Sequence, residues 1–398
     1  MKQAVILAAG EGQRLRPFTV NRPKAMISIA DKPILQYIVE ALARNGVRDI
    51  ILVVGYRKEQ VFDFLGSGEK FGVKISYAAQ EKQLGTAHAL ATVKDMVEDD
   101  FLVLPGDNLI EAATIAEFVD VGPVAVLTKR VKDPQRYGVV EADGDEVQKI
   151  VEKPVAAGSN LVNTGIYAFN KDIFSYIEGR LDIPDVLNSM IASGQAIQAV
   201  ETGGTWLDMI YPWDVISLNN AILRHTVSGM GGTVENGVTI DGNVNIGPDT
   251  VVKAGSSIYG PVVIGSGCEI GPHACIMPFT SIGDNVVISS FTQIKNSVIG
   301  NDVTLGPGSF ISPPDPDPDA IDPAMATRIL ALDPERLTAR DVREVLATAP
   351  APRLILLQGS LAFVTMQPFA EYLVAMGYPE QRIRNPRDGA LSYGSFGS

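Results

Sequence analysis

The chain has 398 residues, of which 46% are hydrophobic and 20% charged, a composition typical of folded globular proteins and unlike that of disordered chains. Its 33 basic and 46 acidic residues give a formal net charge of -13. This charge repels nucleic acids and anionic membranes at long range, so we expect neither as a partner, and any anion site must be local.

Targeting and redox signals favour a cytoplasmic protein. The first residues carry one lysine and a short apolar run, which does not make a signal peptide, and no run reaches the roughly 18 apolar residues of a membrane span. Cys268 and Cys275 form no C-x-x-C pair and have no cluster of metal ligands around them. We therefore expect a reducing, cytoplasmic environment.

Residues 1–228 alternate β-branched runs with helix-like stretches, a pattern that predicts an α/β domain with a Rossmann-like, doubly wound mixed sheet that is mainly parallel. Strands are predicted at "QAVILAA", "DIILVVG", "VKISYAAQ" and "DFLVLPGDN", and a helix at "PILQYIVEALARNGV". Further strands follow at "PVAVLTKRV", "YGVVE", "VQKIVEKP" and "NTGIYAFN". Such a fold binds ligands beyond the carboxyl ends of its strands.

Residues 229–311 have a different rhythm, because an aliphatic residue recurs at every sixth position from Val234 to Ile294. No helix or flat hairpin has this period, whereas the coils of a left-handed parallel β-helix stack such residues into an inner column. The phase slips by one near Ile299, where we expect a bulge or a coil edge.

The remaining residues lack this repeat. Residues 312–323 have the proline and aspartate density of a linker, and residues 324–398 predict an atypical α/β tail of helix, strand and helix. The tail faintly resembles the first strand, loop and helix of an α/β-hydrolase. It lacks a G-x-S-x-G elbow and any histidine, so it cannot form a Ser-His-Asp site by itself.

The segment "LAAGEGQRLRPFTVNRPKAM", residues 7–26, places glycines and four cations between a strand and a helix. Backbone N–H groups of such a turn can approach a phosphate closely, and the cations complete an anion site. The Rossmann fingerprint requires a third glycine where this chain has Leu15, and the P-loop requires a Gly-Lys pair that is absent. The alternative is a solvated, charged loop.

This segment resembles the signature L-A-A-G-x-G-T-R-L-x-P-x-T…P-K-x-M of the nucleoside-diphosphate-sugar pyrophosphorylases, with Gln13 in place of the usual threonine or serine. The resemblance continues in order through "VVGY", "QEKQLGTAHAL", "GDN", "RYGVV", "VEKP", "NTGIYAF" and "TWLDMIYPWDV". It covers residues 1–311 and is strongest to archaeal sugar-1-phosphate nucleotidylyltransferases that carry an acetyltransferase-type hexapeptide domain.

The resemblance implies a Mg²⁺-dependent transfer of a nucleotidyl group from UTP or dTTP to glucose 1-phosphate or N-acetylglucosamine 1-phosphate, with release of pyrophosphate. It implies catalytic roles for Arg14, Lys24 and Lys153, and metal ligation by Asp107 and Asp208. The implied nucleotide-binding residues are Leu7, Ala9, Gly10, Gly12, Gln80, Gly85 and Thr86, and the implied sugar-binding residues are Gly138, Glu152, Asn163 and Gly165.

Other interpretations remain open for several of these residues. Lys153 could form a surface ion pair, and the role of Tyr137 is undecided. We expect His88 to be a helix-face or core histidine, since the sequence shows no partner for it, and His273 to be a corner residue of the β-helix.

Three functions compete at this point. We expect an active nucleotidylyltransferase, because Arg14, Lys24, Asp107 and Asp208 are all present, whereas an inactive sensing or scaffold subunit could have lost them. Acetyl transfer to glucosamine 1-phosphate by the β-helix is the enzymatic alternative. We expect it to be absent, since the coils that would carry the catalytic histidine are missing, and we expect the β-helix to form a homo-oligomer, a trimer or higher.

Overall fold

The computed structural model describes residues 1–313, so the linker beyond residue 313 and the predicted tail lie outside the described residues. The chain divides into two compact units, Met1–Leu218 and a second unit that begins at Asn219. The domain boundary at residue 228 stays a prediction. In the described part of the chain, no helix is long and apolar enough to cross a membrane.

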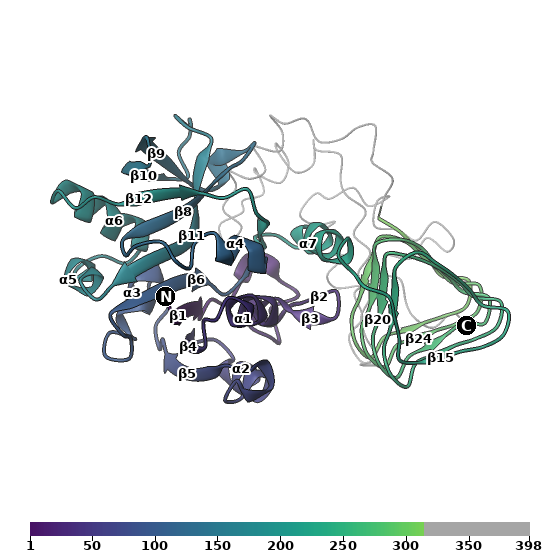
Figure 1. Ribbon diagram of the computed structural model, residues 1–398. Coiled ribbons are helices and arrows are strands. Elements are labelled where there is room, and N and C mark those ends of the chain that lie inside the picture. The colour runs from purple at the N-terminus through teal and green to yellow at the C-terminus, as the bar shows by residue number, and fades with distance from the viewer. Residues whose placement is uncertain (314–398) are drawn as a thin grey trace, which may run out of the picture. The chain divides into compact units, whose positions relative to one another are not determined.

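The first unit is built on a nine-stranded mixed sheet (Figure 1). In spatial order its strands are β5 (Lys74–Ala79), β4 (Asp49–Val54), β1 (Gln3–Ala8), β6 (Asp100–Pro105), β11 (Leu161–Asn170), β8 (Ala125–Arg130), β12 (Gln198–Glu201), β10 (Glu146–Glu152) and β9 (Gly138–Asp143). The first four run parallel to one another, so their carboxyl ends share one edge. Strand β11 is antiparallel to β6 and to β8.

Helices cover both faces of this sheet, which confirms the doubly wound α/β class. On one face, apolar residues of α1 (Ile34–Arg44), α2 (Lys58–Leu65) and α4 (Ala112–Ala116) join one core cluster. On the other face, α3 (Thr86–Ala91), α5 (Ile173–Ile177) and α6 (Ile183–Ala192) join a second cluster. Because the central strands are buried on both sides, they read as continuous apolar runs in the sequence.

The segment "DFLVLPGDN" forms a buried strand closed by turn residues, as predicted, and the chain then enters a second, short strand. Strand β6 ends at Pro105, and a separate strand β7 (Asn108–Ile110) pairs with β13 (Trp206–Asp208). Between β6 and β7 the backbone N–H of Gly106 donates to the carbonyl oxygen of Leu7 at 2.9 Å. A Cβ at Gly106 would lie 2.7 Å from the Cβ of Ala8, so only glycine fits this close passage.

The second unit contains three parallel five-stranded sheets, the arrangement of a left-handed β-helix (Figure 1). Their strands are β14 (Gly229–Met230), β17 (Val244–Ile246), β20 (Val262–Ile264), β23 (Thr280–Ile282) and β26 (Val298–Ile299); β15 (Thr233–Val234), β18 (Val251–Val252), β21 (Glu269–Ile270), β24 (Val287–Ile288) and β27 (Thr304–Leu305); and β16 (Thr239–Asp241), β19 (Ser257–Tyr259), β22 (Cys275–Ile276), β25 (Gln293–Ile294) and β28 (Phe310–Ile311). From Ile246 to Ile294 the residues at every sixth position are at most 1% exposed, as the repeat predicts.

The phase slip near Ile299 arises at a corner of the β-helix. Ile276 and Ile282 are neighbours in one coil, and in the next coil Ile294 and Ile299 take the equivalent positions. The turn after Ile294 therefore has one residue fewer, while the inner column continues without interruption. The helix α7 (Asp214–Leu223) ends shortly before the first coil.

Candidate active site

The loop after β1 has an ordered backbone and exposed cations. Gly12 has a φ of 69°, and a short 3-10 helix, η1 (Gln13–Leu15), follows and buries Leu15 completely. The hydroxyl of Thr19 donates to the carbonyl oxygen of Gly12 at 2.8 Å. Arg14 is exposed, as are the other two arginines of the loop. The apolar and hydroxyl contacts thus fix the loop, and the guanidinium groups stay available to an anion.

Gln13, the departure from the family signature, has a local role. Its side-chain amide donates to Glu11 Oε2 at 3.1 Å, and both groups are on the surface of the loop. This contact draws the amide toward Glu11. We find no contact of Gln13 with Lys24, Asp107 or Asp208 in the described part of the chain.

An ion pair between Lys24 and Asp107 joins the loop after β1 to the turn after β6. Lys24 opens the 3-10 helix η2 (Lys24–Met26), and Asp107 lies in the turn between β6 and β7. The Lys24 side chain is 18% exposed and that of Asp107 is 31% exposed. Gly12 adjoins this pair, since a Cβ there would lie 2.9 Å from the Cβ of Lys24. Residues that are more than eighty positions apart in sequence thus meet at the carboxyl edge of the sheet.

The pairing of β7 with β13 brings Asp208 opposite Asn108, the residue that follows Asp107 in the chain. Burial raises the pKa of the Asp208 carboxyl, while a hydrogen bond from Tyr137 Oη (2.9 Å to Oδ1) and the charge of Arg136 lower it. Burial also raises the pKa of Tyr137, which keeps its phenol a hydrogen-bond donor. Tyr137, whose role the sequence left undecided, is therefore a direct partner of a candidate metal ligand.

The two carboxylates fit a magnesium ion by their donor chemistry. Mg²⁺ prefers oxygen ligands and is held in many enzymes by one or two carboxylates, with substrate phosphates and waters completing the octahedron. Among residues 1–313, no group of three or more His, Cys, Asp or Glu side chains could hold a metal by itself. A metal at Asp107 and Asp208 would therefore depend on phosphate oxygens for part of its coordination.

The four predicted sugar-binding residues gather on β9, β10 and β11. Gly138 pairs with Glu152, and a Cβ at Gly138 would lie 2.8 Å from Glu152 Oε2 and 3.6 Å from the Cβ of Asn163. Asn163 Nδ2 donates to Tyr167 Oη at 2.7 Å, and Asn163 Oδ1 accepts from the N–H of Gly165 at 2.9 Å. These bonds fix the amide of Asn163, and the missing side chain of Gly138 leaves the Glu152 carboxylate accessible.

Lys153 follows directly in the chain and has a φ of 42°. Its Nζ lies 3.6 Å from Glu152 Oε1, and both side chains are about half exposed. The surface ion pair that the sequence left open is thus present. An exposed pair of this kind contributes little to stability, so Lys153 can exchange this partner for a phosphate group.

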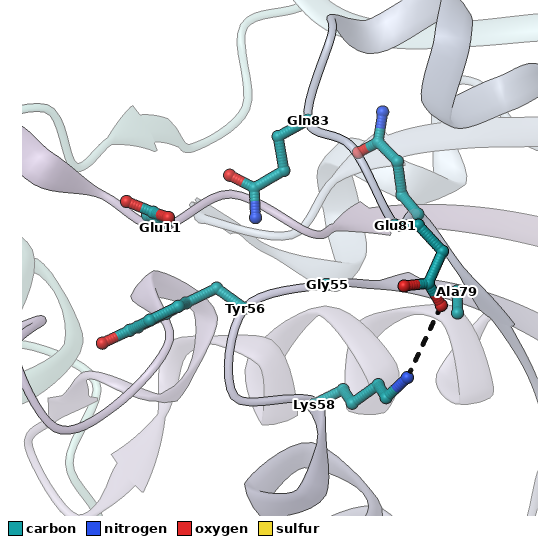
Figure 2. A pocket seen from close by; sticks show the side chains of 8 residues that line it. Glu11, Gly55, Tyr56, Lys58, Ala79, Glu81 and Gln83 are labelled. Atoms are coloured by element: carbon teal, nitrogen blue, oxygen red, sulfur yellow. Dashed lines mark ion pairs between the residues drawn. The ribbon is translucent and has the colours of Figure 1, made fainter.

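A hollow of about 240 Å³ lies beyond the ends of β1, β4 and β5 (Figure 2). In Figure 2 the side chain of Gln83 points toward Glu11, and the ion pair of Lys58 with Glu81 (3.9 Å) closes another side. The residues that line it are Glu11, Gly55, Tyr56, Lys58, Ala79, Gln80, Glu81 and Gln83. Of these residues only Gln80 was assigned a role from the sequence, although Glu11, Gly55, Tyr56, Glu81 and Gln83 lie within the quoted motifs.

Gly85 and Thr86 form the start of α3 beside Gln80. Gly85 has a φ of 143°, and a Cβ there would overlap the carbonyl oxygen of Leu181. The N–H and the hydroxyl of Thr86 donate to Asp182 Oδ1 at 3.1 and 3.2 Å. His88, for which the sequence showed no partner, lies with Nδ1 2.9 Å from Gln80 Nε2. His88 thus lies on a helix, as expected, but it has a partner that the sequence did not show, because the turn into α3 brings it close to Gln80 at the end of β5.

His273 lies in the second unit at a corner of the β-helix with a φ of 56°. Its ring stacks on Phe291 of the next coil, with centroids 5.3 Å apart. The corner position predicted for His273 is thus observed.

Comparison with known proteins agrees with this geometry. A family model described as nucleotidyl transferase matches residues 3–224, and the model for bacterial transferase hexapeptide (six repeats) matches residues 243–278 and 279–313. The chain is 40% identical over 318 residues to the bifunctional protein GlmU of Methanococcus maripaludis, an alignment that covers 77% of this chain and 75% of that protein.

Two further relatives match a shorter part of the chain. A UTP–glucose-1-phosphate uridylyltransferase, AglF, of Haloferax volcanii is 39% identical over 227 residues, which are 53% of this chain and 93% of that protein. A crystal structure assigned to a glucose-1-phosphate thymidylyltransferase of Bacillus anthracis, with bound sucrose, superposes with a TM-score of 0.52 at 31% identity, covering 57% of this chain and 97% of the other. The chain therefore belongs to the nucleotidyl transferase family, here joined to bacterial transferase hexapeptide repeats.

Proposed function

We propose that the protein transfers a nucleotidyl group from UTP or dTTP to glucose 1-phosphate or N-acetylglucosamine 1-phosphate and releases pyrophosphate. The observation that carries this proposal is the convergence of Lys24, Asp107 and Asp208 at the carboxyl edge of the sheet. The names of two relatives, a uridylyltransferase and a thymidylyltransferase for glucose 1-phosphate, support the same substrates.

The reaction requires positioning and charge neutralisation rather than a general base. The second pKa of a phosphate monoester is about 6, so the sugar phosphate is largely ionised at neutral pH. One of its oxygens attacks the α-phosphorus, forms a P–O bond there, and breaks the bond to the β-phosphate, which leaves as pyrophosphate. Negative charge builds up on the oxygens of the α-phosphorus and on the leaving group, where fixed cations stabilise it.

The cations of this chain match those requirements. Lys24 is partly buried beside Asp107 and would contact the α-phosphate, and exposed Arg14 would bind the triphosphate and the leaving pyrophosphate. Gly10 leaves room for a phosphate, since a Cβ there would meet no protein atom within 4 Å. Lys153 would meet the phosphate of the sugar, and the carboxylate of Glu152 would accept hydrogen bonds from sugar hydroxyls.

We propose Mg²⁺ as the cofactor, held by Asp107 and Asp208. When bound, it neutralises phosphate charge and fixes the phosphate oxygens for in-line attack. Tyr137 donates to Asp208 Oδ1 and so orients this carboxylate before any metal is bound.

For the β-helix we propose a role in homo-oligomer assembly, as a trimer or higher, and no acetyl transfer. Its histidine, His273, stacks on Phe291 at a corner, and within residues 1–313 we find no ion pair of its ring with a carboxylate that could orient a general base. The name of one relative, from Sulfurisphaera tokodaii, includes acetyltransferase activity, so this part of the proposal requires a direct assay with acetyl-CoA and glucosamine 1-phosphate. We place the protein in the cytoplasm, because Cys268 and Cys275 are both free thiols.

The test is pyrophosphate release from UTP, dTTP, CTP, GTP and ATP, each with a panel of sugar 1-phosphates, in the presence of Mg²⁺ and after its removal with EDTA. We expect turnover with UTP or dTTP that EDTA abolishes and added Mg²⁺ restores. No turnover with any pair would overturn the proposal and favour a sensing or scaffold role.

A further inference from the structure

The side-chain amide nitrogen of Gln80 is hydrogen-bonded to two acceptors. Gln80 is 5% exposed, and its Nε2 lies 3.1 Å from the carbonyl oxygen of Gly85 and 2.9 Å from Nδ1 of His88. A carbonyl oxygen can only accept, so the amide atom that faces Gly85 is the nitrogen. The second N–H of this amide then points at His88, whose Nδ1 must be the ring nitrogen without a proton.

This arrangement leaves the amide oxygen of Gln80 as its only unused group. No residue within 1–313 donates a hydrogen bond to Gln80 Oε1, although Gln80 lines the hollow at the carboxyl edge of the sheet. For a ligand that reaches the amide from this hollow, the group left to use is therefore an acceptor and not a donor. An amide that could rotate freely would offer both.

The position of His88 is itself fixed by a distant loop. The backbone N–H groups of Ala87 and His88 donate to the carbonyl oxygen of Leu181 at 2.7 and 3.2 Å. The hydroxyl of Thr86 accepts from the N–H of Ile183 at 2.9 Å. The first turn of α3 is thus held against the segment that leads into α6, and the imidazole ring has little freedom to move away from Gln80.

We propose that His88 is a positioning residue that makes the site select uracil or thymine over cytosine, by fixing Gln80 with its oxygen toward the base. The inference rests on the proposed function, in which Gln80 reads the base. Uracil and thymine carry a hydrogen on N3, which can donate to Gln80 Oε1. Cytosine has a lone pair on N3, which would face the same oxygen without a hydrogen between them. The methyl group of thymine does not change this pattern, so His88 does not separate UTP from dTTP.

The test compares His88→Phe, which keeps a ring and removes the acceptor, with His88→Asn, whose Oδ1 can take the place of Nδ1. The full-length variants are titrated with UTP and with CTP by calorimetry, and KM and kcat are measured with both nucleotides. His225→Phe makes the same replacement after α7, and Gln80→Ala removes the proposed base reader. Thermal unfolding of each variant shows that it is folded.

We expect His88→Phe to lower the preference for UTP over CTP by about five- to tenfold, the range for one lost hydrogen bond. The change should lie in Kd and KM, while kcat with UTP stays within about twofold, because the ring does not contact the phosphates. His88→Asn should recover most of the preference, and His225→Phe should keep all of it. If His88→Phe does not fold, His88→Leu, which also lacks an acceptor, takes its place in the comparison with His88→Asn.

Three results would overturn the inference: no UTP preference in the natural chain, an unchanged preference in folded His88→Phe, or an unchanged preference in Gln80→Ala. Failure of the proposed function looks different. In that case no nucleotide and sugar phosphate give pyrophosphate, yet the binding titrations still report whether His88 sets the choice of base.

Discussion

The two units of the chain organise their side chains in opposite ways. In the β-helix each residue lies beside its equivalent in the next coil, as Ile258 lies beside Ile276, so contacts repeat along the chain. In the first unit Lys24, Asp107 and Asp208 come from three distant segments and meet only once the sheet has formed. Contacts that repeat from coil to coil produce a periodic pattern in the sequence. A single contact between residues that are distant in the chain produces no such pattern.

The polar groups of the two units also differ in whether the fold itself uses all of their hydrogen bonds. In the β-helix the hydroxyl of Thr250 donates to the carbonyl oxygen of Gly265 at 2.6 Å and accepts from the N–H of Cys268 at 3.0 Å, so it is used entirely by the fold. In the first unit the oxygen of Gln80 remains free for a ligand among the described residues. Substitutions should therefore affect mainly stability in one unit and mainly activity in the other.

The largest effect is expected for Asp107→Ala. Loss of a metal ligand at the reacting phosphates should lower kcat at least about a hundredfold. Pyrophosphate release at saturating UTP measures this change, and the free energy of unfolding should change little, because Asp107 is partly exposed. Asp143→Ala, an exposed aspartate at the end of β9, is the control and should keep full activity. Unaltered turnover in Asp107→Ala would contradict the assignment of the metal site.

The converse prediction concerns Ile276→Ala in the β-helix. Ile276 is fully buried in the inner column, so its truncation should lower the free energy of unfolding by about 2–5 kcal/mol. Urea denaturation measures the loss, and Val287→Ala, at a position that is 37% exposed, should have a much smaller effect. At temperatures where the variant stays folded, kcat should be unchanged. A drop in kcat there would show that the two units do not divide stability and activity in this way.

Gly10→Ala tests whether the open space beside Gly10 is used by the nucleotide rather than by the packing of the protein. A Cβ at Gly10 would meet no protein atom within 4 Å, so stability should be unchanged, but the methyl group would stand where a phosphate approaches the loop. We expect KM for the nucleotide to rise about tenfold or more in steady-state kinetics. Gly46→Ala is the matched control, because Gly46 also has open space but a φ of 76°. That variant should lose about 1 kcal/mol of stability and keep its KM.

The smallest effect is expected for Tyr137→Phe, which removes one hydrogen bond to Asp208. Without this donor the carboxylate is less well oriented, so the Mg²⁺ concentration for half-maximal activity should rise about three- to tenfold, with kcat at saturating Mg²⁺ nearly unchanged. A Mg²⁺ titration of activity measures it. Tyr37→Phe, whose hydroxyl donates to the carbonyl oxygen of Ile29, should leave the titration unaltered. Identical Mg²⁺ titration curves for Tyr137→Phe and Tyr37→Phe would contradict a role for Tyr137 in metal binding.

The sequence alone determined the class of the fold and the different hydrophobic patterns of its two parts. Continuous apolar runs predicted the strands of the doubly wound sheet, and the six-residue period predicted the β-helix, because both signals repeat over many positions and arise from burial. The candidate site residues were predicted by motif, and the structure brings Lys24 to Asp107 and Gly138 to Glu152. Their roles in catalysis stay predictions until the assays above are made.

Only the tertiary structure decided how individual polar groups are paired. The short strand β7 after the turn at Gly106 was not predicted, and its pairing with β13 positions Asp208, which accepts a hydrogen bond from Tyr137. His88 is eight positions from Gln80, yet their contact depends on the carbonyl oxygen of Leu181, far along the chain, which holds the first turn of α3. A hydrogen bond requires atoms within about 3 Å and a defined direction, and this precision is set by the packing of remote segments rather than by local sequence.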